Sequence, residues 1–295
     1  MGQKFVEFSN FKTEGSGLGN QLRAFIKAVI ISKITNRDLI VTNHWINKLF
    51  ECPYDNKWDR GIIKKNYTIK KIDNGKDYEI YDFNTIKEDI IETGGGDLPI
   101  INIISNKHHK ENKIIQDIVS DKYNFLRKTF VDYLQQPKKE FVVKSKKIID
   151  YDSVDYITLQ FRAFFDVVNS ENKTMFLLDD FIENFIKIIR EQKLETLPIF
   201  ITTDKNEVTN KIKNRLQKEL NSKIIETKYN FGHSAHTQNI ETLCDWLILG
   251  KSKFIYTTGT SYAITSSLIY NDNCMVYNRK NKNRMIKNYI IEHNL

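Results

Sequence analysis

The residues best suited to chemistry begin with an arginine at the end of a strand. The run Thr158–Asp166, TLQFRAFFD, predicts a buried strand over residues 155–161 that ends at Arg162. In sheets of alternating strands and helices, ligands bind at the carboxyl ends of the strands. A guanidinium there suits a phosphate, because its planar fork makes two charge-assisted hydrogen bonds. An arginine held in a structural ion pair would give the same local pattern.

A glycine-containing loop offers a second anion site. Gly17, Gly19 and Asn20 lie in the run GSGLGN before an apolar helix predicted over residues 21–34. Glycines let backbone N–H groups approach an anion, and a helix N-terminus adds favourable partial charge. The alternative is a tight turn with Asn20 as the helix N-cap. The run does not fit a dinucleotide fingerprint, because no clear strand precedes it and the third glycine is misplaced.

Two further strand ends carry polar residues. Asp204 follows a strand predicted over residues 198–202 and could accept N–H groups from a guanine edge, or cap the next helix. Thr260 and Ser261 follow a strand predicted over residues 253–257, at the start of a helix. Their hydroxyls and backbone amides could form a phosphate-sized pocket, or only an N-cap without a ligand.

The second half of the chain predicts the elements that would position these residues. Strands at 155–161, 198–202, 223–226, 253–257 and 274–277 alternate with helices at 179–193, 205–220, 239–250 and 261–270. This alternation indicates a parallel, doubly wound α/β sheet. The first half predicts a strand at 38–42, helical structure over 116–147 with a break at Pro137, and no clear order of elements in 50–115. A last helix is expected over 283–293.

Composition excludes several other classes of protein. The 40% hydrophobic and 28% charged residues are ordinary for a globular chain, and the net charge of +8 suits an anionic partner. No arginine-rich arm or zinc spacing indicates nucleic-acid binding. Three distant cysteines do not suggest a disulfide framework. Without an apolar run of membrane-spanning length or a signal-peptide core, we expect a soluble, cytoplasmic protein with no membrane segment.

In order and spacing, these motifs resemble those of inverting GDP-fucose-dependent fucosyltransferases, a group that includes α-1,2, α-1,6 and protein O-fucosyltransferases. The run containing Gln160 and Arg162 is similar to the Q-x-R-x-F motif of the plant xyloglucan-type α-1,2 enzymes, where many other members have H-x-R. Thr203 and Asp204 resemble the central T-D element of the group. The other similar runs are Gly17–Leu22, Thr35–Val41, Asn124–Phe130 and Asp245–Ser261.

The resemblance implies a GT-B glycosyltransferase, with two Rossmann-like domains facing a cleft. Residues 1–148 would form an acceptor-side domain. Residues 149–295 would bind the nucleotide sugar and return a C-terminal helix to the first domain. The donor would be GDP-fucose, with no separate cofactor and no metal, and the acceptor a glycan hydroxyl, by similarity that of a galactose linked through an α-1,2 bond. The oligomeric state is not predicted.

Catalysis by inversion implies a leaving-group stabiliser and a general base. Arg162 would stabilise the departing diphosphate, together with the amides at Gly17–Asn20 and at Thr260 and Ser261, while Gln160 and Asp204 would also contact the donor. The base would be Glu171 or, closer to the arginine, Asp166, and both are also compatible with solvated loop acids. The chain departs from the family pattern in Gln160, in having one arginine where several families have two, and in the late position of Asp166.

Two other motifs could bind a metal. Asp150-Tyr-Asp152 has the D-x-D form of metal-dependent transferases, but it precedes the arginine strand and is better explained as a polar linker. His233 and His236 have a metal-ligand spacing without a third ligand nearby in the sequence. Two alternative functions remain open: the same fold with another nucleotide sugar, and a non-enzymatic protein that binds anionic glycans or nucleic acid.

Overall fold

The computed structural model shows an α/β protein and describes residues 3–9, 17–52, 67–72, 81–94, 100–162, 171–227, 240–277 and 283–292. The chain divides into two compact units, residues 1–139 with 290–295 and residues 140–289. The sequence placed the boundary at 148/149, and the acceptor and donor roles given to the two halves stay a prediction. No helix among the described residues is both long and apolar enough to cross a membrane.

The first unit contains a parallel four-stranded sheet in the order β2-β1-β4-β3. Its strands are β1 (Phe5–Phe8), β2 (Asp38–Val41), β3 (Ile69–Ile72) and β4 (Ile90–Thr93). In the register, Val6 lies opposite Leu39 and Ile91. A strand therefore does precede the glycine loop, contrary to the sequence prediction. The sequence does not indicate this strand, because the run FVEF is short and contains the charged Glu7. In the structure Glu7 is fully buried and accepts a hydrogen bond from the Thr42 hydroxyl at 2.5 Å.

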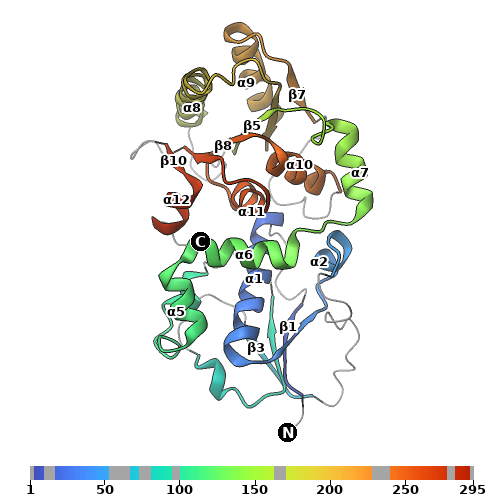
Figure 1. Cartoon of the computed structure of the whole chain (residues 1–295), viewed down its shortest axis with the longest axis vertical. Coiled ribbons are helices and arrows are strands. Elements are labelled where there is room, and N and C mark those ends of the chain that lie inside the picture. The colour runs from blue at the N-terminus through green and yellow to red at the C-terminus, as the bar shows by residue number, and fades with distance from the viewer. Residues whose placement is uncertain are drawn as a thin grey trace. The chain divides into compact units, whose positions relative to one another are not determined.

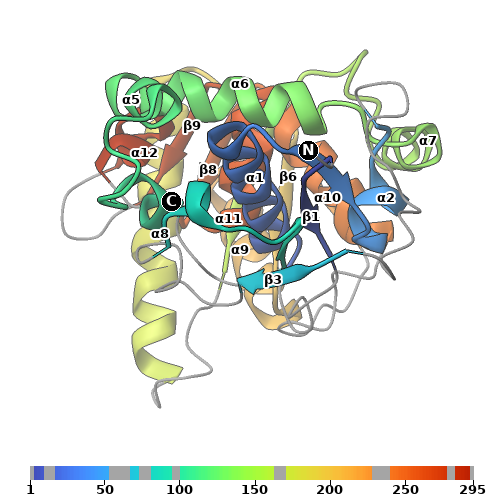
Figure 2. The same cartoon turned by 90° about the horizontal axis from the view of Figure 1, so that it is seen from below.

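Helix α1 (Leu18–Thr35) packs on this sheet and is buried along most of its length. The rings of Phe8 on β1 and Phe25 on α1 lie 5.5 Å apart. Figure 2 shows α5 (Lys113–Ser120) and α6 (Lys122–Leu134) beside α1, and Tyr133 of α6 contacts Phe25 with ring centroids 6.0 Å apart. The remaining short helices of the unit are α2 (His44–Leu49), η2 (Phe83–Thr85) and α4 (Ile101–Ile104).

Arg37, just after α1, has a structural role. Its guanidinium donates to the carbonyl oxygens of Ile86 at 2.6 Å, Glu88 at 2.8 Å and Asp89 at 3.4 Å. Burial of the side chain lowers the pKa of the guanidinium. Arg37 thus ties the end of α1 to the segment that leads into β4.

The second unit contains a six-stranded sheet in the order β10-β9-β8-β5-β6-β7. The strands are β5 (Ile157–Phe161), β6 (Ile199–Thr203), β7 (Ile224–Glu226), β8 (Phe254–Thr257), β9 (Cys274–Val276) and the antiparallel β10 (Arg284–Met285). Its helices are α7 (Lys139–Ile148), α8 (Glu171–Glu191), α9 (Asn206–Glu219), α10 (Ile240–Lys251) and α11 (Ser261–Tyr270). Helix α12 (Ile286–Glu292) begins in this unit, and its residues from Ile290 on belong to the first unit. The expected alternation is present, but α8 begins eight residues early and β10 was not expected.

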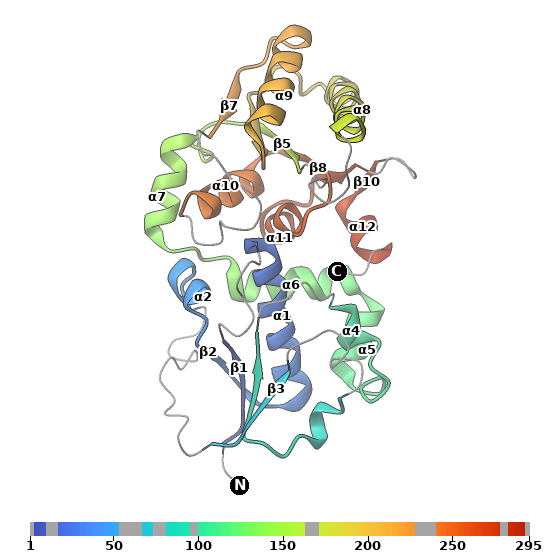
Figure 3. The same cartoon turned by 180° about the vertical axis from the view of Figure 1, so that it is seen from behind.

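Helices cover both faces of this sheet, as Figures 1 and 3 show. One face packs against α8 and α9 through a large apolar cluster that includes Leu159, Phe185 and Ile212. The other face packs against α7 and α10 through Phe200, Ile248 and Ile149. Side chains alternate along a strand, so Thr158 and Gln160 of β5 lie on the face opposite to Leu159.

The chain order of the strands reverses beside β5. From β5 the chain builds β6 and β7 on one side, and then crosses to build β8 and β9 on the other side. The carboxyl ends of β5 and β8 therefore flank a topological switch point, which is where ligands bind in open α/β sheets.

Close packing of α10 on α11 requires a glycine. A Cβ added at Gly250 would lie 2.4 Å from Ser266 Oγ, 2.7 Å from Tyr270 Cδ2 and 3.2 Å from the Ser266 carbonyl oxygen. No real Cβ tolerates the first two distances, so a side chain at 250 requires Ser266 and Tyr270, or the helices, to shift.

We therefore expect Gly250→Ala to lower the free energy of unfolding by ~1–3 kcal/mol, the usual cost of overpacking a core. Urea denaturation followed by circular dichroism measures this change. Ser266→Ala removes the nearest atom, so the double variant should lose less stability than the sum of the two single variants. Additive losses would show that contact with Ser266 is not the cause.

Asp245 of α10 is a buried acid in this unit. Its Oδ2 accepts a hydrogen bond from the Thr227 hydroxyl at 2.9 Å, while its Oδ1 is buried and has no hydrogen-bond partner among the described residues. Burial raises the pKa of this carboxyl from its ordinary value of 3.8 to about 7. The fold therefore favours the protonated form of Asp245.

This pKa predicts stability that decreases with rising pH. The unfolded chain releases the Asp245 proton near pH 4, whereas the folded chain retains it until about pH 7, so stability falls across that window. Between pH 5 and pH 8 we expect Asp245 to lower the free energy of unfolding of the wild type by ~2–3 kcal/mol. This decrease should be absent in Asp245→Asn. Urea midpoints of both proteins at the two pH values test this. Parallel pH profiles would contradict it.

Candidate functional site

Three residues meet at the carboxyl edge of the second sheet. In the parallel register, Phe161 of β5 pairs with Thr203 of β6, and Gln160 of β5 pairs with Thr257 of β8. Arg162, Asp204 and Thr258 are the first residues after these three strands. The sheet thus brings together residues that are as far as 96 positions apart in the chain.

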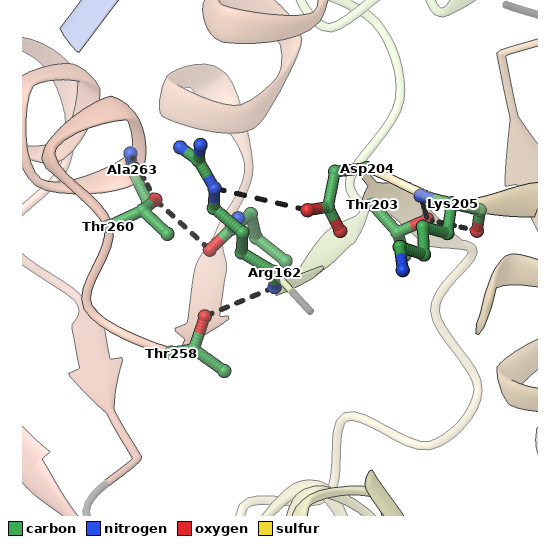
Figure 4. Close-up of polar contacts among 8 residues, drawn as sticks. Arg162, Thr203, Asp204, Lys205, Thr258, Thr260 and Ala263 are labelled. Atoms are coloured by element: carbon green, nitrogen blue, oxygen red, sulfur yellow. Dashed lines mark hydrogen bonds and ion pairs between the residues drawn. The ribbon is translucent and has the colours of Figure 1, made fainter. Parts of the chain in front are cut away.

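Arg162 contacts both neighbouring segments. Its backbone N–H donates to the Thr258 hydroxyl at 3.2 Å, and its Nε lies 3.9 Å from Asp204 Oδ2. Figure 4 shows the arginine between Asp204 on one side and the turn containing Thr258 and Thr260 on the other. The side chain is 29% exposed, so its charge is accessible at the edge of the sheet.

The turn from β8 into α11 has a strained position that favours glycine. Gly259 has a φ of 78°, and an added Cβ would lie 2.8 Å from Val276 Cγ1. Its N–H donates to the Thr257 hydroxyl at 3.1 Å. Thr260 is the N-cap of α11, and its hydroxyl accepts from the Ala263 N–H at 3.2 Å. The Thr260 oxygen is thus already used inside the protein, which leaves the backbone amides of the first turn as the natural anion donors.

The first turn of α11 has the charge pattern of an anion site. The first intrahelical bond runs from the Ile264 N–H to the Thr260 carbonyl oxygen at 2.9 Å, so the amides of Ser261 and Tyr262 precede it. No acidic residue lies in this turn to offset the helix dipole. Arg162 adds a full positive charge at the same sheet edge.

Gln160 lies beneath this edge. Its side-chain Oε1 accepts hydrogen bonds from the hydroxyls of Thr257 at 2.5 Å and Thr260 at 3.3 Å. The residue is only 5% exposed. Sequence analysis singled out Gln160 and Thr260 as donor contacts but missed Thr257 and Thr258. The run of hydroxyl residues after β8 was visible, but which of them turn inward follows only from the register.

Asp204 does not cap α9. The N-cap of that helix is Lys205, which makes no side-chain capping bond. The hydroxyl of Thr203 accepts from the Lys205 N–H at 3.3 Å instead. Asp204, with a side-chain exposure of 16%, is directed to Arg162. Asp179 is likewise not at a helix start, because α8 begins earlier; it pairs with Lys211 of α9 at 3.0 Å.

The glycine loop residues lie at the start of α1 in the first unit. Gly17 is the N-cap with a φ of −66°, and the N–H of Asn20 donates to its carbonyl oxygen at 3.0 Å. Gly19 and Asn20 lie in the first turn, which contains no acid. The helix therefore begins before Asn20, which is not its cap. The part of Gly17, Gly19 and Asn20 in donor binding stays a prediction.

The proposed bases lie at the margin of what the structure describes. Asp166 is outside the described residues. Glu171 is the first residue of α8, but its side chain is also outside them. Their assignment stays a prediction.

Of the two candidate metal motifs, the structure describes only Asp150-Tyr-Asp152. Asp150 accepts a hydrogen bond from the Ser153 hydroxyl at 2.9 Å, and Asp152 pairs with Lys146. Both acids thus serve the loop after α7. His233 and His236 lie outside the described residues, and the described part of the chain contains no group of three potential metal ligands.

In the described part of the chain, Cys52, Cys244 and Cys274 form no disulfide with one another. Burial raises the pKa of both Cys244 and Cys274 to about 12. A thiol is nucleophilic only as the thiolate, so these two residues are structural.

Comparisons with known proteins relate the chain to glycosyltransferases only through structure. No family model matches it, and no curated protein matches it in sequence. A mutant of Arabidopsis thaliana FUT1 in complex with GDP is similar with a TM-score of 0.61 at 12% identity, over 94% of this chain and 71% of that one.

Two other solved structures resemble the chain along nearly their whole length. The α-1,6-fucosyltransferase NodZ of Bradyrhizobium, co-crystallised with GDP, gives a TM-score of 0.55 at 10% identity, over 96% of this chain and 98% of that one. POFUT1 in complex with GDP-fucose gives 0.51 at 10% identity, over 90% and 93%. At this identity the likeness shows the fold, which is the expected α/β GT-B fold of two Rossmann-like domains.

Proposed function

We propose that this protein is a glycosyltransferase that moves fucose from GDP-fucose to a glycan hydroxyl with inversion and without a metal. The observation that carries the proposal is the cluster of Arg162, Asp204 and the Thr258–Ser261 turn at the switch point of the second sheet. It is supported by the three solved structures of the same fold whose complexes contain GDP or GDP-fucose.

The donor's diphosphate would bind at the second sheet. The Arg162 guanidinium can make two charge-assisted hydrogen bonds with phosphate oxygens. The amides in the first turn of α11 would contact the same group, because a helix N-terminus with no internal acid favours an anion. Asp204, beside the arginine, would orient the guanidinium and could accept N–H groups from the guanine base.

The same groups would stabilise the leaving group. Transfer breaks the bond between the sugar's anomeric carbon and the β-phosphate oxygen, and GDP departs with additional negative charge. Fixed donors aimed at this charge need no reorganisation as it develops. Arg162 and the α11 amides would therefore supply the electrostatic part of catalysis, and no step requires a metal ion.

Inversion requires the acceptor hydroxyl to attack from the opposite face of the sugar. The acceptor oxygen forms the new bond to the anomeric carbon, and its proton passes to a base. Glu171, and secondarily Asp166, is the proposed base. The proposed linkage is α-1,2 to galactose, by resemblance to the plant xyloglucan-type enzymes, and the product's linkage is measurable by NMR.

Replacing the arginine tests the electrostatic role. We expect Arg162→Ala to reduce kcat at least ~100-fold, because one donor aimed at developing charge contributes about 3 kcal/mol. Fucose transfer from GDP-fucose to a galactose-terminated oligosaccharide is the assay. Arg190→Ala is the matched control: Arg190 lies on α8 and donates to the Glu219 carbonyl oxygen at 3.0 Å, so its loss should leave kcat unchanged. Near-normal turnover in Arg162→Ala would remove Arg162 from the site.

The base is tested by a pH–rate profile. Glu171→Gln should lower kcat. It should also abolish the rise of kcat with increasing pH on the acid side of the profile, because the amide cannot accept the proton. Asp166→Asn is the companion variant and should keep that limb. The reverse pattern would transfer the role to Asp166, and an unchanged profile in both variants would exclude a carboxylate base at either position.

Donor identity is tested by ligand-induced stabilisation. GDP should raise the melting temperature, whereas UDP and ADP should not, because only a ligand that binds the folded state stabilises it. Stabilisation by UDP alone would favour a different donor, and no response to any nucleotide would favour a non-enzymatic protein. Activity that survives EDTA would support a reaction without a metal.

A further inference from the structure

One buried amide connects the two anion-binding segments of the second sheet. Gln160 Oε1, at the end of β5, accepts hydrogen bonds from Thr257 and Thr260, which lie on either side of the Gly259 turn. We propose that Gln160 is a positioning residue: it holds the β8–α11 turn at a fixed place relative to Arg162, so that both bind one phosphate group together. This inference rests on the proposed function.

The hydrogen bonds around the two threonines fix their direction. Thr257 Oγ1 accepts the Gly259 N–H at 3.1 Å, and Thr260 Oγ1 accepts the Ala263 N–H at 3.2 Å. Each hydroxyl still has one proton to donate, and Gln160 Oε1 is the acceptor that both protons reach. The side-chain amide must therefore present its oxygen to the threonines and its Nε2 elsewhere. Figure 4 shows Thr260 beside Ala263 and on the same side of Arg162 as Thr258.

The backbone joins the same two segments. The Thr258 N–H donates to the Gln160 carbonyl oxygen at 3.3 Å, and the Arg162 N–H donates to the Thr258 hydroxyl at 3.2 Å. Side-chain and backbone bonds from Gln160 and Arg162 thus reach three residues of the turn. The Arg162 backbone and the start of α11 are consequently tied together before a ligand arrives.

Burial increases the importance of the hydrogen bonds between Gln160 and the two threonines for the structure of the turn. Gln160 is 5% exposed, Thr260 3% and Thr257 0%. Removing the amide oxygen would leave two buried hydroxyl protons without an acceptor, and water could replace it only by opening the turn. The cost of an unsatisfied buried donor exceeds the net gain from an ordinary exposed hydrogen bond. The turn should therefore loosen when Gln160 loses its oxygen.

Gln160→Met is the direct test, because methionine has a similar volume and no amide. In the ligand-free protein we expect the amides of residues 258–264 to exchange with deuterium about 10-fold faster, as expected for the loss of a buried hydrogen-bond acceptor. The Kd for GDP, measured by calorimetry, should rise by a similar factor. Peptides from α9 should exchange at the wild-type rate.

Thr158→Val is the matched control. Thr158 lies two residues before Gln160 on the same strand and the same face, is fully buried, and its hydroxyl has no hydrogen-bond partner among the described residues. Both exchange at 258–264 and the Kd for GDP should match the wild type. Gln160→Glu keeps the acceptor oxygen and should restore slow exchange, although its charge would weaken GDP binding.

The two readouts separate this inference from the proposed function. Wild-type exchange at 258–264 in Gln160→Met would overturn the positioning role, whatever the protein binds. Fast exchange in this variant, in a protein whose wild type ignores GDP, would support the positioning role and reject the proposed donor. If Gln160→Met does not fold, Thr257→Val replaces it, with accelerated exchange of the same segment expected and unchanged exchange overturning the inference.

Discussion

The candidate site depends on the lateral pairing of β5 with β6 on one side and β8 on the other. Because the three strands are parallel and in register, Arg162, Asp204 and Thr258 emerge at one edge. A slip of one residue would turn every side chain of β5 to the opposite face. Gln160 would then point at the α8–α9 side, and the two threonine hydroxyls would lose their acceptor. The same register that packs Leu159 into the core therefore also assembles the polar edge.

At this edge the negative charge of Asp204 lies near the positive charge of Arg162 but does not cancel it. Arg162 Nε lies 3.9 Å from Asp204, which exceeds hydrogen-bond distance. The acid can hold the guanidinium in place while the arginine still attracts an anion, and a side chain held in place loses less rotational freedom when it binds. The α11 N-terminus contributes partial charge from backbone amides, which cannot move away from a ligand. A side-chain charge held by Asp204 and the dipole of a helix N-terminus thus lie at the same edge of the sheet.

The sequence predicted the second unit better than the first because its signals are local. The buried strand Ile199–Thr203, for example, is an apolar run that ends on polar residues, and the amphipathic helix α9 follows it. In the first unit, β1 is a four-residue strand with a buried glutamate, and no local pattern indicates that Glu7 finds partners inside the fold. At the site, residue types indicated Gln160, Arg162, Asp204 and Thr260. Gln160 and Arg162 bond to residues 96 to 100 positions away, and Arg162 also pairs with Asp204 on a neighbouring strand end. No local pattern contains these neighbours.

Arg37 and Arg162 show that two residues of the same type can have different roles in this protein. Arg37 lies in a run that resembles the fucosyltransferase signature, yet the residue is only 7% exposed and its guanidinium is bonded to three backbone carbonyls of the first unit. Arg162 lies at a sheet edge, beside a carboxylate and a helix N-terminus. A carbonyl-bonded, buried guanidinium can only hold the chain together, so the likeness of residues 35–41 bears on the fold alone. The charge of Arg162, by contrast, remains exposed enough at the sheet edge to reach a ligand.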